Sequence, residues 1–553
     1  MEYLFTETIL GASALVGFMS LLPKFRSRFL LSRAKHRSLA GHSRMAKRIA
    51  RLIPFYEYDE YRFFRVDGAP EFVVAKRMRS LDALAEIFEK KFRRSAAMTE
   101  QATTIISDLE FTGAYRVPYQ FSRYLRSRLK AGSFVYSSGG VFVTDLDGNF
   151  YYDLTGSYGV NVFGYDFYKA CIAEGARRVE NLGPVLGSYH PIVLENAERL
   201  KKISGLDEVS FHMSGTEAVM QAVRLARYHT GKKNLVRFCG AYHGWWEDVQ
   251  PGIGNPMPPG KTYTLADMSV RSLKVLEDRN DIACVLINPL QALHPNKAAP
   301  GDSSLIDSSR SANFDREAYT LWLKQLRDVC TRKGIVFILD EVFVGFRLAP
   351  GGAQSYFDIQ ADMVTYGKTL GGGLPVGVVC GRKDLMRRFR KDRPADICFA
   401  RGTFNSHPYV MGAMQVFLEQ LEDFDIKLLY SDQDRLWNQR AQSLNLQLEA
   451  EGLPVAVSNL ASIWTVSYTT PSSYNWMFQY YLKAEGLLLS WVGTGRLIFS
   501  LNYTDEDFAK VSNKFMQAAR RMVWDGWWWS EPSMTNKEIR RRVVKEMIRA
   551  KLG

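Results

Sequence analysis

The chain has 553 residues, of which 46% are hydrophobic and 24% are charged, so it can bury a large core and is not a disordered polypeptide. Its net charge of +14 is concentrated at the two ends: ten Lys/Arg and no acid lie between Lys24 and Arg51, and seven Lys/Arg face two acids between Lys537 and Lys551. Because these basic runs flank apolar segments and no nucleic-acid module is present, nucleic-acid binding is not favoured.

The chain opens with an apolar segment. Residues 8–22 carry no charge, and the uncharged stretch extends from residue 3 if Glu7 is tolerated. That length is borderline between a membrane-spanning helix and an interfacial one. The segment lacks the positive start of a secretory signal, and the Lys/Arg directly after it would keep the rest of the chain on the cytoplasmic side of a membrane. A docked helix and an ordinary cytoplasmic protein are the alternatives.

Residues 56–130 read as an added, partly helical region. Residues 81–88, for example, place apolar side chains at i, i+3, i+4 and i+7. We interpret this region as a cap or a substrate entry. The six cysteines of the chain are scattered without CxxC pairs, so no metal site and no disulfide framework is predicted.

Residues 213–218 (MSGTEA) form a turn before the helical pattern of residues 219–226. Small residues at a helix start leave backbone N–H groups available to an anion, so Ser214, Gly215 and Thr216 are candidates for a phosphate site. An ordinary Ser/Thr helix cap is the alternative. Tyr242 and His243 follow within Gly240–Gly244, where an aromatic ring could stack on a flat ligand.

Residues 335–339 (IVFIL) have the pattern of a buried parallel strand, and Asp340 follows at the end where α/β sheets place ligands. An acid at this point can keep a pyridine nitrogen protonated. Lys368 lies in the glycine-rich stretch of residues 367–373, where a desolvated lysine becomes a nucleophile for an aldehyde. The acid and the amine suit opposite ends of one cofactor, pyridoxal 5'-phosphate, which acts as an electron sink.

Several segments together resemble the class III aminotransferases of fold type I, in the branch of glutamate-1-semialdehyde aminomutase and of the aminotransferase domains of polyketide and peptide synthetases. The likeness runs from about Ser133 to about Arg520. The segments that carry it are residues 143–159 (VTDLDGNFYYDLTGSYG), 214–227 (SGTEAVMQAVRLAR), 241–244 (AYHG), 339–382 and 399–408 (FARGTFNSHP).

The resemblance implies an α/β fold like that of aspartate aminotransferase: a large domain with a mostly parallel sheet and a smaller α+β domain, here preceded by a helical extension. The division we expect is 1–23 hydrophobic segment, 24–130 extension, 131–190 start of the small domain, 191–435 large domain, 436–530 end of the small domain and 531–553 basic tail.

The resemblance also assigns roles. Lys368 would form the internal imine and Asp340 would pair with the pyridine nitrogen. Val342 and Tyr242 would pack on opposite ring faces, with His243 beside them, and the residues that would hold the phosphate are Ser214, Gly215 and Thr216. Thr403 would reach the phosphate of the neighbouring subunit, which implies a homodimer with shared active sites.

Departures from the family pattern narrow the expected function. Asn288-Pro289 replaces the usual Glu-Pro, and Gly495 stands where the aminomutase carries a glutamate. The pattern around Trp491 and Gly493 is closer to the assembly-line enzymes. Arg401 is a candidate for a carboxylate or phosphate contact.

We therefore expect an aminotransferase that moves an amino group from an amino acid to the carbonyl of a hydrophobic acyl chain, free or on an acyl carrier protein, at a membrane surface. An aminomutase or racemase is the alternative, and a non-catalytic membrane scaffold is argued against by the intact Lys368 and Asp340.

Four tryptophans precede the second basic run: Trp524 and the triplet of residues 527–529. Tryptophans beside cations suit the headgroup region of a membrane. A buried aromatic cluster followed by a solvated basic tail is the alternative.

Overall fold

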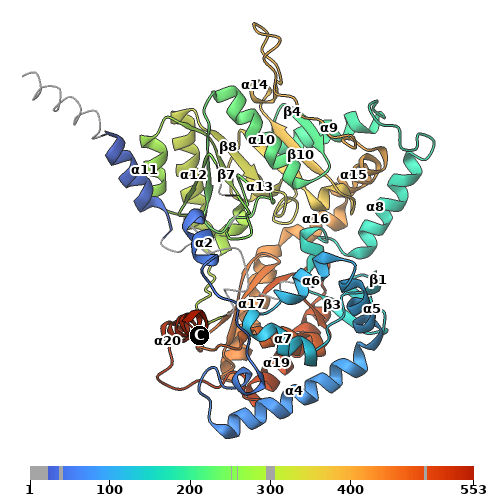
Figure 1. Cartoon of the computed structure of the whole chain (residues 1–553). Coiled ribbons are helices and arrows are strands. Elements are labelled where there is room, and N and C mark those ends of the chain that lie inside the picture. Colours follow the sequence, from blue (N-terminus) through green and yellow to red (C-terminus); the bar gives the residue numbers. More distant parts are fainter. Residues whose placement is uncertain are drawn as a thin grey trace, which may run out of the picture.

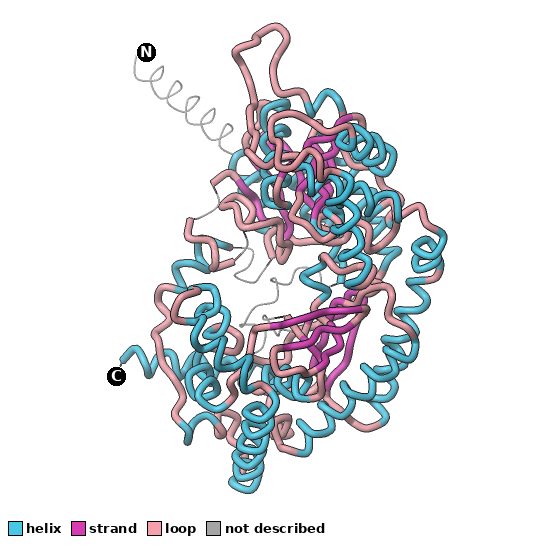
Figure 2. Tube along the Cα trace, turned by 90° about the vertical axis from the view of Figure 1, so that its right-hand side faces the viewer, coloured by secondary structure: helices cyan, strands magenta, loops and turns pink. Residues whose placement is uncertain are grey.

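The computed structural model describes residues 23–36, 42–250, 252–257, 260–293, 306–490 and 495–552. Figures 1 and 2 show two lobes. The upper lobe in Figure 1 holds a sheet with helices packed around it, and the lower lobe combines the C-terminal segment with most of the N-terminal helices. The apolar residues 3–22 and the positions of Trp491 and Gly493 lie outside the described residues.

The upper lobe is built on a seven-stranded sheet. Its strands in spatial order are β4 (Glu208–His212), β10 (Gly377–Gly381), β9 (Met363–Gly367), β8 (Val336–Asp340), β7 (Ile282–Ile287), β5 (Asn234–Phe238) and β6 (Thr262–Leu265). Neighbours from β9 to β6 pair in parallel, and β10 is antiparallel to both β9 and β4. This confirms the mostly parallel sheet that the sequence predicts.

The strands are continuous apolar runs because helices cover both faces of the sheet. Every residue of β7, β8, β9 and β10 is buried, as expected for parallel strands between helix layers. The helices of this lobe are α8 (Tyr165–Arg178), α9 (Ile192–Ser204), α10 (Gly215–Thr230), α11 (Val270–Asp278), α12 (Arg316–Lys333), α13 (Gly352–Tyr356), α14 (Lys383–Met386), α15 (Pro408–Gln420) and α16 (Phe424–Ser431).

The lower lobe contains two small sheets. One has the order β1 (Val135–Gly139), β2 (Phe142–Asp145), β3 (Phe150–Asp153), β13 (Leu487–Leu488), and the other β11 (Val455–Leu460), β12 (Ile463–Tyr468), β14 (Arg496–Ile498). The parallel pairing of β13 with β3 joins segments more than 300 residues apart in the chain. Helices α17 (Gln433–Ala450), α18 (Phe478–Ala484) and α19 (Asp505–Trp524) complete this lobe.

The expected N-terminal extension is helical. It contains a helix over residues 23–34, followed by α2 (Ser43–Ala50), α3 (Glu60–Phe63), α4 (Glu71–Lys91), α5 (Arg93–Thr103), α6 (Ser107–Ala114) and α7 (Tyr119–Arg128). Helix α4 is anchored by buried Arg77, which donates to both Asp67 carboxylate oxygens at 2.9 and 2.6 Å and to the Gly526 carbonyl at 2.9 Å. The part of the extension around α4 therefore belongs to the lower lobe's core, whereas the helix over residues 23–34 contacts the upper lobe, where Arg279 donates to the Ser27 hydroxyl at 3.1 Å.

The tryptophan triplet belongs to that same core. Trp527 and Trp528 are buried, and the Trp527 indole N–H donates to Ser80 of α4 at 3.1 Å. For these two residues the membrane interpretation is wrong and the buried-cluster alternative is right, because α4 covers Trp527 and the Trp528 indole N–H donates to Asn475 at 3.1 Å. Trp524 is exposed and lies beside Lys76, 4.8 Å from its ammonium.

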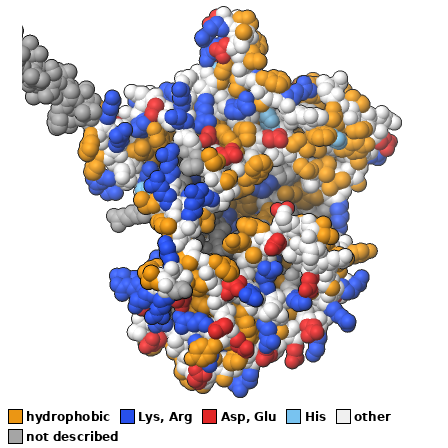
Figure 3. Space-filling model, in the orientation of Figure 1, with side chains coloured by type: hydrophobic (Ala, Val, Ile, Leu, Met, Phe, Trp, Pro, Cys, Tyr) orange, Lys and Arg blue, Asp and Glu red, His pale blue; other side chains and the backbone are white. Residues whose placement is uncertain are grey.

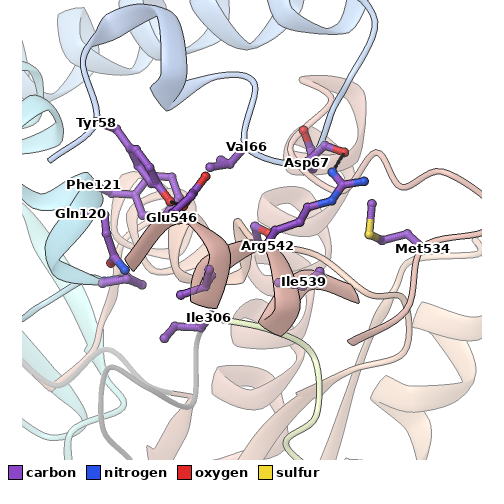
Figure 4. Close-up of a pocket in the computed structure, with 13 residues that line it drawn as sticks. Tyr58, Val66, Asp67, Gln120, Phe121, Ile306, Met534, Ile539, Arg542 and Glu546 are labelled. Carbon is purple, nitrogen blue, oxygen red and sulfur yellow. Dashed lines mark hydrogen bonds between the residues drawn. The ribbon is translucent and has the colours of Figure 1, made fainter. Parts of the chain in front are cut away.

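The basic tail is a docked helix, α20 (Asn536–Leu552). Figure 4 shows Ile539, Arg542 and Glu546 of α20 facing the segment that carries Tyr58 and Asp67. The Tyr58 hydroxyl donates to Glu546, and Arg542 donates to the Asp67 carbonyl at 2.8 Å. One face of α20 is thus fixed to the extension, so the alternative of a fully solvated tail does not hold for that face. No helix within the described part of the chain is long and apolar enough to cross a bilayer.

Candidate active site

Asp340 is the last residue of β8, and three hydrogen bonds fix its carboxylate. His243 Nδ1 donates to Oδ2 at 2.7 Å, while the Thr365 hydroxyl and the Val342 N–H donate to Oδ1 at 3.0 and 3.1 Å. Asp340 and His243 are both buried. Strand register explains the Thr365 contact, because Thr365 of β9 lies directly opposite Asp340. The carboxylate therefore has one orientation before any ligand binds.

Lys368 starts the turn that follows β9, in the left-handed backbone region at φ 49°. That conformation is unusual for a residue with a side chain and persists only where the surroundings enforce it. The pKa of Lys368 is lowered to about 8 by burial, with further lowering by the guanidinium groups of Arg347 and Arg496 and opposition from Asp340. The chain thus places a readily deprotonated amine within the electrostatic reach of Asp340.

Small residues make the room that Lys368 occupies. The Lys368 ammonium lies 5.0 Å from the centre of the Phe343 ring. A Cβ atom at Gly159 would come within 2.7 Å of that ring and 3.3 Å of Lys368 Cδ. Gly159 also has a φ of 98°, so any other residue there would be strained as well as crowded.

The predicted phosphate turn lies where β4 passes into α10. Ser214 caps this helix by accepting from the Glu217 N–H at 3.2 Å, so the helix-cap alternative holds for its side chain. The N–H groups of Gly215 and Thr216 belong to the first helical turn, which has no intrahelical acceptors, and the helix dipole favours an anion there. A Cβ at Gly215 would approach Val342 Cγ1 to 2.6 Å, so the turn and Val342 are in direct contact.

The aromatic segment reaches the same place from β5. Tyr242 is half exposed, and burial followed by the nearby Asp340 charge raises its pKa. Asn288 Nδ2 donates to the Tyr242 carbonyl at 3.1 Å, so the residue that departs from the family pattern supports this segment. A Cβ at Gly244 would meet the Thr216 hydroxyl at 2.5 Å, which places the end of the segment against the phosphate turn.

Two predicted residues stand apart from this cluster within one subunit. Thr403 and Arg401 are exposed. The Arg401 guanidinium lies 5.9 Å from the Tyr189 ring centre, and the structure records no contact of Thr403 with Lys368 or Asp340. The role of Thr403 toward a neighbouring subunit stays a prediction.

Sequence reasoning missed the residues that surround the motifs from other elements. Arg347 is buried and donates to the Ser462 hydroxyl at 3.0 Å and to the Phe499 and Asn161 carbonyls at 2.6 and 2.8 Å, which ties the two lobes together. Arg496 of β14 is partly buried, and desolvation lowers its pKa to about 10. A single Arg within a strand pattern does not indicate, from the sequence, that its side chain lies near the lysine of the site.

This arrangement fits pyridoxal phosphate. The site combines the fixed carboxylate of Asp340, the low-pKa amine of Lys368, and the start of helix α10, where an anion can bind and where Gly215 contacts Val342. His243 Nε2 is a further sign, since within the described residues it is buried without a hydrogen-bond partner. Buried polar atoms without partners commonly belong to a ligand site.

Comparison with known proteins gives the same picture. The sequence model of the family described as Aminotransferase class-III matches residues 126–519. Two relatives carry the name glutamate-1-semialdehyde 2,1-aminomutase. That of Alkaliphilus oremlandii is 28% identical, over 70% of this chain and 91% of the relative. That of Pelodictyon phaeoclathratiforme is 30% identical, over 67% of this chain and 87% of the relative.

Solved structures agree on the fold. A structure described as a transaminase with PLP bound has a TM-score of 0.63 and 26% identity, covering 78% of this chain and 99% of that one. A glutamate-1-semialdehyde aminomutase from Pseudomonas aeruginosa PAO1 has a TM-score of 0.64, covering 81% of this chain and 99% of its own, at 18% identity that speaks for the fold alone. The fold and the cofactor expected from the sequence are confirmed.

Proposed function

This chain belongs to the class III aminotransferase family and is a pyridoxal-phosphate-dependent transaminase; on that premise we propose that it moves an amino group from an amino-acid donor to the carbonyl of a hydrophobic acyl-chain substrate. The observation that carries the proposal is the pairing of the fixed Asp340 carboxylate with a lysine whose pKa is lowered to about 8. An amine with that pKa is neutral in a large fraction of molecules near pH 8 and can act as a base.

When bound, pyridoxal phosphate supplies an electron sink that weakens bonds at the carbon bearing the amine. The chain's own residues do the rest. Asp340 would pair with the ring nitrogen, and its carboxylate is held in one orientation because His243 and Thr365 donate to its two oxygens. Lys368 Nζ takes up and returns the proton, and the start of α10 binds the phosphate.

The choice of acceptor rests on the family resemblance and on the residues around the amine. Gly495 offers no carboxylate where the aminomutase carries a glutamate, and Arg496 next to it adds a partly buried positive charge. A carbonyl substrate that also carries an anionic group fits this charge. The chain length of the acyl group and its attachment to a carrier protein follow from the resemblance alone.

An aminomutase is the second candidate, since both relatives named above are called glutamate-1-semialdehyde 2,1-aminomutase. Such an enzyme would use the same Lys368 and Asp340 but leave the nitrogen on the carbon skeleton from which it came. The distinction is therefore the fate of the nitrogen atom and not the composition of the site.

The test follows that atom. Purified enzyme would be incubated with amino acids labelled with ¹⁵N in the α-amino group and with a medium-chain acyl aldehyde or β-keto acyl thioester, and products would be read by mass spectrometry. Transfer predicts the label on the acyl skeleton, with unlabelled keto acid released in equal amount. Label that stays on the donor skeleton at a new carbon would establish the isomerase instead.

We further propose that the enzyme is a homodimer in which Thr403 completes the neighbour's site. The support is the exposure of a segment that carries large apolar side chains, among them Phe399 and Phe404 on either side of Thr403. Apolar patches of this kind on a soluble protein mark interfaces. Light scattering coupled to gel filtration should give about twice the chain mass, and a monomer that retains full activity would contradict the shared site.

A membrane location is the last part of the proposal, and α20 supports it. Its outward face carries both cations and exposed aliphatic residues. The cations are Arg541 and Lys545, and the aliphatic residues are Val544, Ile548 and Leu552, which are 52%, 53% and 84% exposed. Figure 3 shows Lys and Arg gathered at the lower left over α20 and again above it. Basic helices with an apolar stripe bind anionic membrane surfaces.

The membrane proposal is tested with a protein that starts at residue 23, so that α20 acts without the apolar segment. Vesicles with anionic lipid should sediment this protein, and vesicles of neutral lipid should not. The double variant Val544→Asp/Ile548→Asp should stay in solution, whereas Leu446→Asp, which alters an equally exposed leucine on α17, should still bind. Equal binding of all three proteins would rule out the α20 surface.

A further inference from the structure

The N-terminal extension contains a groove of about 500 Å³ that shares no residue with the cofactor site. Helices α5, α6 and α7 form its walls, and Tyr480 of α18 lies at its floor. Figure 1 shows these three helices together in the lower lobe. The volume lies within the range of small-molecule sites in proteins. Most of the lining precedes residue 126, where the family match begins, so the groove is formed largely by the added N-terminal region.

Apolar side chains line part of the groove. Its aromatic and aliphatic lining residues are Phe55, Leu109, Tyr115, Tyr119, Leu129 and Tyr480. Tyr115 and Phe55 are exposed in spite of their size. Solvent-facing apolar walls of this kind are costly to maintain unless something covers them. The lining therefore suits an alkyl chain.

The charges in the groove do not balance. Arg123 pairs with Glu57 at 3.0 Å and Lys130 pairs with Glu100 at 3.0 Å. The remaining two cations, Arg116 and Arg126, have no carboxylate within 4.0 Å among the described residues. Both line the same groove, and the charge of each lowers the pKa of buried Tyr480 against the larger effect of its burial. The guanidinium of Arg126 lies over α6, 3.7 Å from the position of a Cβ atom at Gly113.

One buried polar group points to the same conclusion. Ser122 lines the groove, is only 7% exposed, and its hydroxyl has no hydrogen-bond partner within the described residues. An excess of positive charge and a vacant hydroxyl donor are what an anionic headgroup requires.

We propose that this groove binds a single-chain amphiphile with an anionic headgroup, the alkyl chain lying against the aromatic walls and the headgroup between Arg116, Arg126 and Ser122. A guanidinium donates two parallel hydrogen bonds to a carboxylate or a phosphate, so either headgroup suits the two arginines. The site stands independently of the reaction proposed above, because it rests on different residues.

Isothermal titration calorimetry on the cofactor-loaded enzyme tests the site with three ligands of equal chain length, dodecyl phosphate, dodecanoate and dodecanol, each below its micelle concentration. We expect saturable binding of at least one anion and at least tenfold weaker binding of dodecanol. The better of the two anions identifies the headgroup. Equal binding of all three, or of none, overturns the proposal.

The matched variants isolate the two arginines. Arg116→Gln/Arg126→Gln should weaken anion binding at least tenfold. Arg128→Gln, on the same helix α7 but outside the groove and paired with Asp82, should leave it unchanged. Unaltered binding in the double variant overturns the proposal. Thermal melts verify that the variants are folded. The reaction with the amino donor is measured in the same samples, so that a loss of amphiphile binding can be told apart from a loss of amino transfer.

Discussion

The hydroxyl of Thr365 offers the sharpest test of how the site is held together. Thr365→Val keeps the shape of the side chain and removes the donor that lies 3.0 Å from Asp340 Oδ1. A hydrogen bond to a charged group contributes about 1.5–3 kcal/mol. Because His243 and the Val342 N–H still hold the carboxylate, the lower end applies, and about 1.5 kcal/mol corresponds to roughly a tenfold slower reaction.

The assay is the single-turnover reaction with an amino donor, followed by stopped-flow absorbance of the cofactor. The matched control is Thr465→Val, which removes a hydroxyl that is equally buried but has no hydrogen-bond partner in the described part of the chain. The control should react at the wild-type rate. If Thr365→Val is as fast as the wild type, or if Thr465→Val slows as much, the reasoning about Asp340 is refuted.

Three further outcomes are expected. Lys368→Ala should lose the visible absorbance of protein-bound cofactor together with turnover, and a variant that keeps both would remove Lys368 from its role. Burial lowers the pKa of Lys368 from 10.5 to about 8, so the neutral amine becomes the main form as pH rises through 8. The rate at which cofactor-free enzyme takes up the cofactor should therefore rise with a midpoint near pH 8. A midpoint above about pH 9.5 would contradict the effect of burial on this pKa. Trp527→Ala should cost about 3–5 kcal/mol of unfolding free energy in denaturant melts, whereas Trp524→Ala, at an exposed position, should cost little; equal effects would dispute the core position of Trp527.

The parts of the site that could be predicted are those written in short contiguous segments. Asp340 ends an apolar run and Lys368 starts a glycine-rich turn, and in both cases the local sequence dictates the local structure. The contact of Thr365 with Asp340 depends on strand register and could not be read from either segment. The same holds for Asn288, whose side chain supports the backbone of a segment 46 residues away.

The terminal regions were harder to predict because the same tryptophan-rich and basic composition suits either a membrane surface or a packed protein core. A run of tryptophans before a basic helix suits a membrane surface, but it equally suits a core when another helix covers it, and here α4 does so through Ser80. The basic tail contains only two acids, and one of them, Glu546, fixes the helix to the extension. Which face of a helix is buried depends on its partner, and Tyr58, the partner of Glu546, lies 488 residues away in the chain.

The most direct test of amino transfer is the absorbance spectrum of the cofactor-loaded enzyme during titration with single amino acids, without any acceptor. The account predicts that at least one amino acid converts the cofactor from its aldehyde to its amine form and releases one equivalent of keto acid per active site, and that Lys368→Ala does neither. A spectrum that no amino acid converts, with no keto acid released, would contradict transamination from an amino-acid donor.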